Sequence, residues 1–269
     1  MIDKKQIAII KKDIKAITAN KRMFSVLLIV PLVMTVFTPV IFILTFHFSP
    51  MDSPYMIQMI NMMGSAFQKT PGMENGDLRN ALINLIIDNI MPLFFMFIPI
   101  MASSVMAASA FVGEKEKKTL ETLLYCPLPL KEIFNAKILA SFILSMAVSL
   151  LSFIVMIVVI EAVLFILNGV FIMPGINWLI IMLLISPAVS LLAINLMVRG
   201  SAKSQSFEES QQRAVFLILP IILLVAGQFT GIMMLSAWLL LAIGAVIAII
   251  ALLMFRGSFG KFQYEALLQ

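Results

Sequence analysis

Long apolar runs alternate with short polar segments along this chain. The runs cover 23–47, 89–112, 138–160, 177–198, 214–235 and 237–255, and none contains Lys, Arg, Asp or Glu. A helix needs about 20 such residues to cross a hydrocarbon layer of about 30 Å. The pattern therefore predicts an all-α membrane protein with six spanning helices, because a helix satisfies its own backbone hydrogen bonds in lipid.

The first 22 residues predict an amphipathic helix that lies in the membrane interface. Ile9, Ile10 and Ile17 fall near one helical face, whereas the lysines fall mostly on the others. Such a helix places its apolar face at the headgroup boundary and keeps its charges in water. The alternative interpretation is a basic segment that only stops translocation.

The outer loop at 48–88 is the longest connection between spans. IQMINMM at 57–63 and LRNALINLI at 78–86 repeat apolar residues every three to four positions, which predicts two short interfacial helices. In the second span, Pro92 and Pro99 predict kinks. Neighbouring helices are expected to supply donors for the carbonyls that these prolines leave free.

Lysine and arginine are distributed unequally among the connections. All but two of the nineteen lie in the N-terminal segment, in the loops after the second and fourth spans, or in the tail; the exceptions are Lys69 and Arg79. Because positive residues near span ends are retained in the cytoplasm, both termini and the 113–137 segment are predicted to be cytoplasmic, in a plasma-membrane protein. The net charge of +5 then reflects topology, and no nucleic-acid partner is expected.

Composition narrows the chemistry further. At 61% hydrophobic and 12% charged residues, the chain is typical of multi-pass membrane proteins. A single cysteine, Cys126, excludes an internal disulfide, and a single histidine, His47, excludes a multi-histidine metal site. Trp178 and Trp238 begin the fourth and sixth spans, and both are expected in the outer headgroup layer. No metal or cofactor is expected to bind this chain.

A few polar groups near the spans are candidates for a substrate path. The third apolar run continues through Glu161, which is expected at the outer interface; the alternative is a buried acid coupled to protons or cations. Gly227 and Gly231 form a G-x-x-x-G pair that favours close helix approach, with Gln228 and Thr230 beside them. These polar groups face either a pathway or a neighbouring helix, and the second is favoured slightly.

The segment 113–137 is charged, broken by proline and flanked by long apolar runs. Its charges exclude it from hydrocarbon, yet Leu120, Leu123 and Leu124 keep an apolar stripe. Pro127 and Pro129 are expected to end the helix that carries the stripe. The pattern predicts a docking element for a second protein; a solvated hairpin that only sets topology is the plainer alternative.

The run at 113–124, followed by Pro127, Pro129, Glu132 and Lys137, resembles the signature after the second span of ABC transporter permeases of the type-2 export class. Six spans, a lead-in helix and the 204–213 segment before Pro220 fit the same plan, so the resemblance covers nearly the whole chain. One departure is Lys118, where many members have glycine before the threonine. A stiffer helix start is expected there.

The resemblance implies a single exporter membrane domain over 1–269, with spans one and two to residue 112, a coupling region at 113–137, spans three to six at 138–255 and a cytoplasmic tail at 256–269. It implies a cytoplasmic ATPase partner that holds ATP and Mg, and a second permease subunit, identical or paralogous. The residues expected to couple to the ATPase are Glu114, Glu116, Thr119, Leu120, Glu121, Leu123, Leu124, Pro127 and Pro129. The cargo is not indicated.

Other classes of function fit these residues less well. The chain has no phosphate-binding loop, so it is not expected to be an ATPase itself. Glu208, Glu209 and Arg213 resemble the first motif of CAAX-processing proteases, but the later histidines of that family are missing. An ATP-independent channel or a membrane scaffold stays as the alternative to an exporter.

Overall fold

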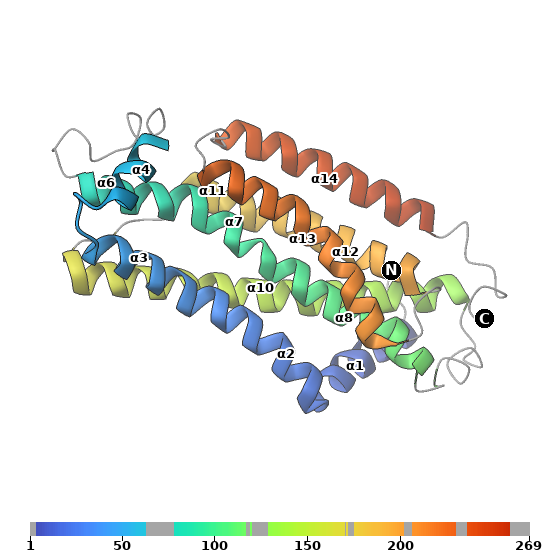
Figure 1. The fold of residues 1–269 in the computed structure, drawn as a ribbon. Coiled ribbons are helices and arrows are strands. Elements are labelled where there is room, and N and C mark those ends of the chain that lie inside the picture. The colour runs from blue at the N-terminus through green and yellow to red at the C-terminus, as the bar shows by residue number, and fades with distance from the viewer. Residues whose placement is uncertain are drawn as a thin grey trace.

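The computed structural model describes residues 4–62, 78–116, 119, 129–169, 171, 175–201, 206–229 and 236–258. Within these ranges the chain is helical and contains no strand (Figure 1). Six helical segments are long and apolar enough to cross a membrane: Leu27–Phe48, Arg79–Glu116, Lys131–Asn168, Ile176–Ser201, Phe207–Gln228 and Ala237–Arg256. The predicted all-α fold with six candidate membrane helices is therefore confirmed.

Several of these spans are built from more than one helical piece. Helix α1 (Lys4–Ala19) precedes the first span, which consists of α2 (Lys21–Leu32), the π-helical turn η1 (Val33–Phe37) and α3 (Thr38–Phe48). After α4 (Pro54–Met62), the second span consists of α6 (Leu78–Leu85), η3 (Ile86–Ile90), α7 (Met91–Phe95) and α8 (Phe97–Glu116). The remaining elements are α10 (Leu130–Asn168), α11 (Ile176–Ile180), η4 (Ile181–Ile185), α12 (Ser186–Ser201), α13 (Phe207–Phe229) and α14 (Ala237–Ser258).

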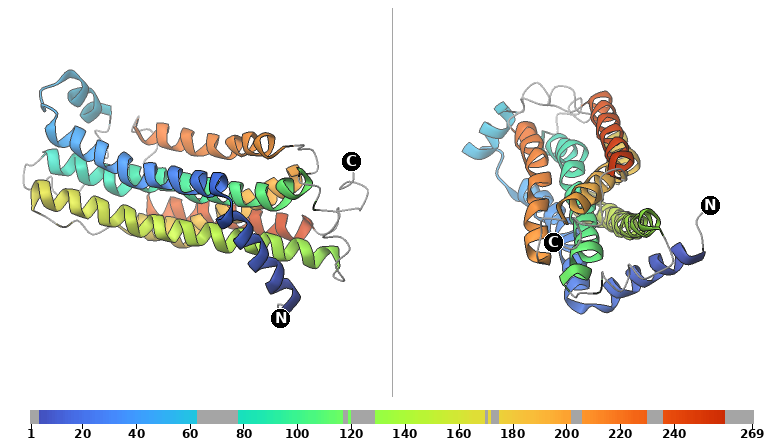
Figure 2. Two further views of the ribbon diagram at one scale, coloured as in Figure 1. Left: turned by 90° about the horizontal axis from the view of Figure 1, so that it is seen from below. Right: turned by 90° about the vertical axis from the view of Figure 1, so that its right-hand side faces the viewer.

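The second span lies at the centre of the bundle. Of its most apolar stretch 83% is buried, against 61% for the fourth span and 28% or less for the others. Helices α10, α12 and α13 all pack on α8, and α1 runs across one end of the bundle (Figure 2). The second span therefore holds most of the packing, and the exposed apolar faces of the other spans are left for lipid or a partner.

Each of the three π-helical turns within the described residues ends two residues before a proline. The prolines are Pro39 after η1, Pro92 after η3 and Pro187 after η4. A proline has no N–H to donate, and its ring crowds the carbonyl of the preceding turn. The wider π-helical turn relieves that contact and leaves backbone carbonyls in need of other donors.

At Pro92 those donors come from the fourth span. The Trp178 Nε1–H donates to the Ile87 carbonyl at 3.0 Å, and the Asn177 side-chain amide donates to the Asp88 carbonyl at 3.2 Å. These carbonyls lie five and four residues before Pro92, where the N–H of any other residue at that position would bond. The prediction that a neighbouring helix compensates for Pro92 is confirmed, and Met96 interrupts the helix again just before Pro99.

This bonding overturns the expectation for Trp178. Its side chain is 1% exposed and packs against the rings of Phe95 and Phe153, at centroid distances of 6.4 and 5.9 Å. It therefore lies inside the bundle and does not face lipid headgroups, because its N–H satisfies a buried carbonyl. Trp238, in contrast, is 82% exposed.

The outer connection also differs from its predicted form. One expected outer helix is present as α4, but the other, α6, continues directly into the second span. Ala81, Leu82 and Leu85 bury one face of α6, and the Arg79 guanidinium donates to the carbonyls of His47 and Ser49 at the end of α3. Packing on the first span thus extends this helix well before the predicted start at 89.

We expect Trp178→Phe to lower stability although it keeps an aromatic ring in place. The change leaves the buried Ile87 carbonyl without a donor, which costs about 1–3 kcal/mol. Thermal unfolding in detergent measures the loss, and Trp238→Phe, at an exposed site, is the matched control with no expected change. Equal effects of the two substitutions would contradict this role for Trp178.

Candidate functional site

A buried lysine, Lys137, joins three helices where α8 ends and α10 begins. Its side chain is 1% exposed, and its Nζ lies 3.3 Å from Asp13 Oδ2 on α1 and 2.7 Å from Glu114 Oε2 on α8. It also donates to the carbonyl of Ala110 at 2.9 Å, and the ring of Phe111 lies 5.8 Å away. A buried ammonium needs this many partners because its desolvation is costly.

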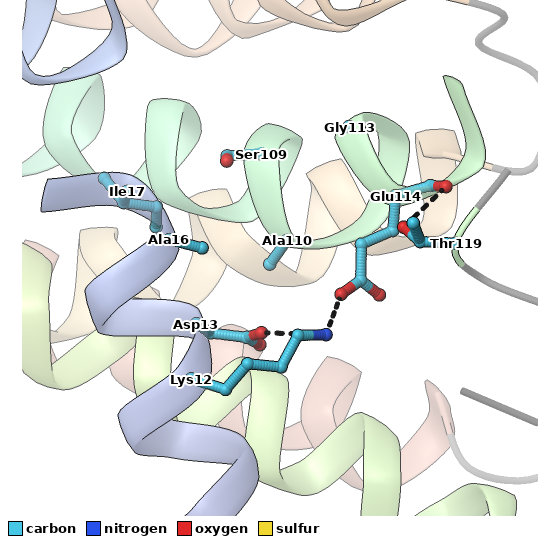
Figure 3. Close-up of a pocket in the computed structure, with 9 residues that line it drawn as sticks. All are labelled: Lys12, Asp13, Ala16, Ile17, Ser109, Ala110, Gly113, Glu114 and Thr119. Atoms are coloured by element: carbon cyan, nitrogen blue, oxygen red, sulfur yellow. Dashed lines mark hydrogen bonds and ion pairs between the residues drawn. The ribbon is translucent and has the colours of Figure 1, made fainter. Parts of the chain in front are cut away.

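A second cation, Lys12, completes the cluster from α1. Its Nζ lies 2.5 Å from Glu114 Oε1 and 3.8 Å from Asp13 Oδ1, and its side chain is 50% exposed. Figure 3 shows Lys12 lying between these two carboxylates. We call Lys12, Asp13, Glu114 and Lys137 the lysine junction. Two carboxylates and two ammonium groups balance one another there.

The pattern of α1 explains why Asp13 is buried. The residues of α1 that are buried are Ile9, Asp13 and Ile17, four positions apart along one face. Ile9 packs with Ile133 of α10, and Ile17 packs with α8 around Met106. Asp13 lies between two apolar contacts and must therefore find a cation inside the bundle.

Burial raises the pKa of Asp13 above its ordinary value of 3.8, and the charge of Glu114 acts in the same direction. Lys137 and Lys12 lower this pKa but do not outweigh the desolvation. Keeping Asp13 ionised in the lysine junction is therefore unfavourable relative to solvent. Adding or removing one charge in the junction should change how stably α1 docks on the bundle.

The junction adjoins both ends of the 117–128 segment, of which the structure describes none but Thr119. The Thr119 N–H and hydroxyl both donate to the Glu114 carbonyl, at 2.9 and 3.3 Å. At the other end, Pro129 precedes α10 and its carbonyl accepts the N–H groups of Glu132 and Ile133. These bonds are local to each side, and the ion pair between Glu114 and Lys137 is what joins the second span to the third beside the segment.

Glu116 connects the same region to the fifth span. Its Oε2 accepts the backbone N–H of Phe207 at 3.3 Å, in the first turn of α13. Between α1 and the end of α8 there is also a cavity of about 170 Å³. Its lining consists of Lys12, Asp13, Ala16, Ile17, Ser109, Ala110, Gly113, Glu114 and Thr119 (Figure 3).

Of the residues predicted to contact an ATPase, the structure places Glu114, Glu116, Thr119 and Pro129. Leu120, Glu121, Leu123, Leu124 and Pro127 lie outside the described residues, and their role stays a prediction. Glu114 was expected to couple to the ATPase. In this structure its carboxylate bonds to Lys12 and Lys137 of the same chain, so its position is set from within.

Of the candidate pathway residues, the structure describes Glu161, Gly227 and Gln228. Gln228, near the end of α13, is 1% exposed, and Glu161 is half-buried in the last turns of α10. Thr230 and Gly231 lie outside the described residues, and Gly227 is half-buried. Among the described residues, no group of three His, Cys, Asp or Glu side chains could hold a metal ion.

Sequence reasoning missed Asp13 altogether, and it used Lys137 as a positive charge of the loop and as part of the family signature without giving it a partner. The signal was present, because Asp13 is the one acid among the isoleucines of the buried face of α1. A carboxylate in that position needs a partner on the facing helix. The lysine at the start of the third span is the residue that supplies it.

In the described part of the chain, six helices long and apolar enough to cross a membrane define a multi-pass membrane protein. A model of the ABC-2 family transporter proteins matches residues 7–238. The chain therefore belongs to the ABC-2 transporter family, whose members are membrane permease components that generally work with a separate cytoplasmic ABC ATPase. Neither a curated protein nor a solved structure matches it.

We expect Lys137→Met to destabilise the fold strongly. The substitution leaves Asp13 without its nearest cation and Glu114 with Lys12 alone, and loss of one partner from a buried ion pair costs about 3–5 kcal/mol. Thermal unfolding in detergent measures the loss. Lys131→Met, at an exposed position of the same helix, is the control, and adding Asp13→Asn to Lys137→Met should restore part of the stability. A mild effect of Lys137→Met would show that the junction is not needed.

The raised pKa of Asp13 predicts a particular pH dependence. The docked carboxylate binds a proton more readily than the free one, so its contribution to stability is complete below pH 3.8 and is lost as pH rises through the raised value. Acidification from neutral pH towards that range should therefore stabilise the wild type more than Asp13→Asn. Thermal midpoints at several pH values test this, and identical responses of the two proteins would contradict it.

Proposed function

We propose that this chain is the membrane-spanning subunit of an ATP-driven exporter. A second permease subunit, identical or paralogous, completes the substrate path, and a separate cytoplasmic ATPase holds ATP and Mg and drives the cycle. Family membership supports this proposal, as does the charged segment after the second span. Under it the protein lies in the plasma membrane with both termini and the lysine junction on the cytoplasmic side.

The observation that carries the proposal is the ion pair between Glu114 and Lys137. Only 2.7 Å separates Glu114 Oε2 from Lys137 Nζ, and these residues stand on opposite sides of the segment at 117–128. A force applied to that segment by an ATPase would thus act on the second and third spans together. Asp13 extends the same connection to α1, and Glu116 extends it to the start of α13.

Such a connection suits alternating access. In that mechanism nucleotide binding and release shift the permease between two arrangements of its spans, and the shift requires elements that move as units. The second span is the most buried of the six, so its displacement would be felt by α10, α12 and α13. Coupling at its end therefore reaches most of the bundle.

The test is copurification of the ATPase with the tagged chain in mild detergent, identified by mass spectrometry. We expect Leu123→Asp with Leu124→Asp to abolish ATPase recovery while membrane insertion is retained, because the change removes the apolar stripe proposed to dock. The matched control is Leu267→Asp with Leu268→Asp, a second leucine pair in the tail. It should leave recovery unchanged.

Other outcomes would overturn the proposal in different ways. Recovery that survives the Leu123 and Leu124 changes would move the docking site elsewhere in the chain. Failure of the wild type to retain any ATPase would favour the channel or scaffold. Nucleotide hydrolysis by the recovered complex, stimulated by cargo candidates, would then separate transport from scaffolding.

A further inference from the structure

Helix α1 has a second, outward face whose role the lysine junction does not explain. Successive residues of a helix are turned by about 100°, so Lys4, Lys11 and Lys15 all lie within about 20° of the direction opposite Asp13. All three side chains are exposed. We call these three residues the outer face of α1. The only acid of this helix, Asp13, is buried on the other side, so the outer face presents positive charge alone.

The two flanks of α1 show how the outer face is turned relative to the bilayer. Lys12 on one flank reaches Glu114 at the end of α8, where the second span leaves the bundle. The opposite flank, which carries Ile7 and Ile14, therefore faces the membrane side. Ile7 is 42% exposed and Ile14 is half-buried, whereas Ile10 packs against Ile133 and Ala136 of α10. This flank suits contact with acyl chains, and the outer face then stands at the level of the headgroups.

We propose that the outer face of α1 binds the anionic headgroups of phospholipids in the adjoining leaflet. Three ammonium groups on one helical face complement lipid phosphates, and clusters of lysines on an amphipathic helix next to a span attract anionic lipid. Helix α1 is followed after a single residue by α2, which leads into the first span. The outer face is therefore held beside the bilayer and not extended into solution.

Lipid bound to the outer face would affect the lysine junction through α1, because Asp13 lies on the opposite side of the same helix. A lipid held by Lys11 and Lys15 fixes the helix that presents Asp13 to Lys137 on its other side. Anionic lipid thereby favours the docked position of α1. This inference concerns the permease alone and does not rest on the proposed ATPase.

The test measures lipid retained by the purified full-length chain. The protein is equilibrated in detergent with equal amounts of phosphatidylglycerol and phosphatidylcholine, and the lipids that remain after gel filtration are quantified by mass spectrometry. We expect enrichment of phosphatidylglycerol on the wild type that falls as salt is raised. Each lysine at an anionic surface contributes roughly fivefold in affinity, so Lys4→Gln, Lys11→Gln and Lys15→Gln together should reduce the enrichment by at least about fivefold.

Two matched variants distinguish binding at the outer face of α1 from attraction by the net charge of the protein. Lys4→Arg, Lys11→Arg and Lys15→Arg keep the charge and should keep the enrichment. Lys131→Gln, Arg199→Gln and Arg256→Gln remove three exposed charges from other helices and should also keep it. An unchanged thermal midpoint shows that the glutamine variant remains folded.

Three results would overturn the proposal. They are equal retention of the two lipids by the wild type, full enrichment on the glutamine variant of α1, and an equal loss in the variant of the other helices. The first means that α1 does not distinguish headgroup charge. The other two mean that lipid is attracted elsewhere or by net charge.

Discussion

One buried ammonium group, that of Lys137, determines how the α1 end of the bundle is built. Moving a charge of this kind out of water is unfavourable by several kcal/mol even after relaxation, so it is tolerated only where opposite charges and hydrogen bonds surround it. The carboxylates come from α1 and α8, and a carbonyl comes from α8 as well. Helix α1 is consequently part of the bundle, because undocking it would remove Asp13 from the lysine.

The middle of the bundle is built on a different constraint. In the part of the chain that the structure describes, three spans contain a π-helical turn followed by a proline, and at Pro92 the freed carbonyls are bonded by side chains of the fourth span. Breaks of this kind are where helices bend. The bundle therefore combines a stiff ionic connection at the lysine junction with spans that can bend at their π-helical turns. A motion delivered at the junction can then change the shape of the bundle without disrupting the junction.

Much of this could be predicted from the sequence, because it depends on patterns local to one helix. Six apolar runs predict six spans, and the charged run after Gly113 indicates the family. What could not be predicted depends on contacts between helices. Trp178 resembles an interfacial tryptophan until the Ile87 carbonyl is known to need its N–H.

The start of the second span and the junction show the same limit. The segment at 78–86 was predicted to be a separate interfacial helix, but packing on α3 and the bonds of Arg79 hold it in line with the second span. Asp13 and Lys137 are 124 residues apart, and no single helix contains the reason for their pairing. The sequence hint to this pairing is a carboxylate, Asp13, on a helical face that otherwise carries isoleucines and therefore needs a cation.

The central claim, that the junction moves as one unit, is most directly tested by distances between spin labels. In a Cys126→Ser background, labels at Ala16 of α1 and Lys131 of α10 report the junction, and a label at Tyr55 of α4 in each of two copies reports the far end. The account predicts that the distance between α1 and α10 stays the same with and without nucleotide on the partner ATPase, while the distance between the two α4 labels changes. A distance between α1 and α10 that shifts or broadens with nucleotide would contradict it.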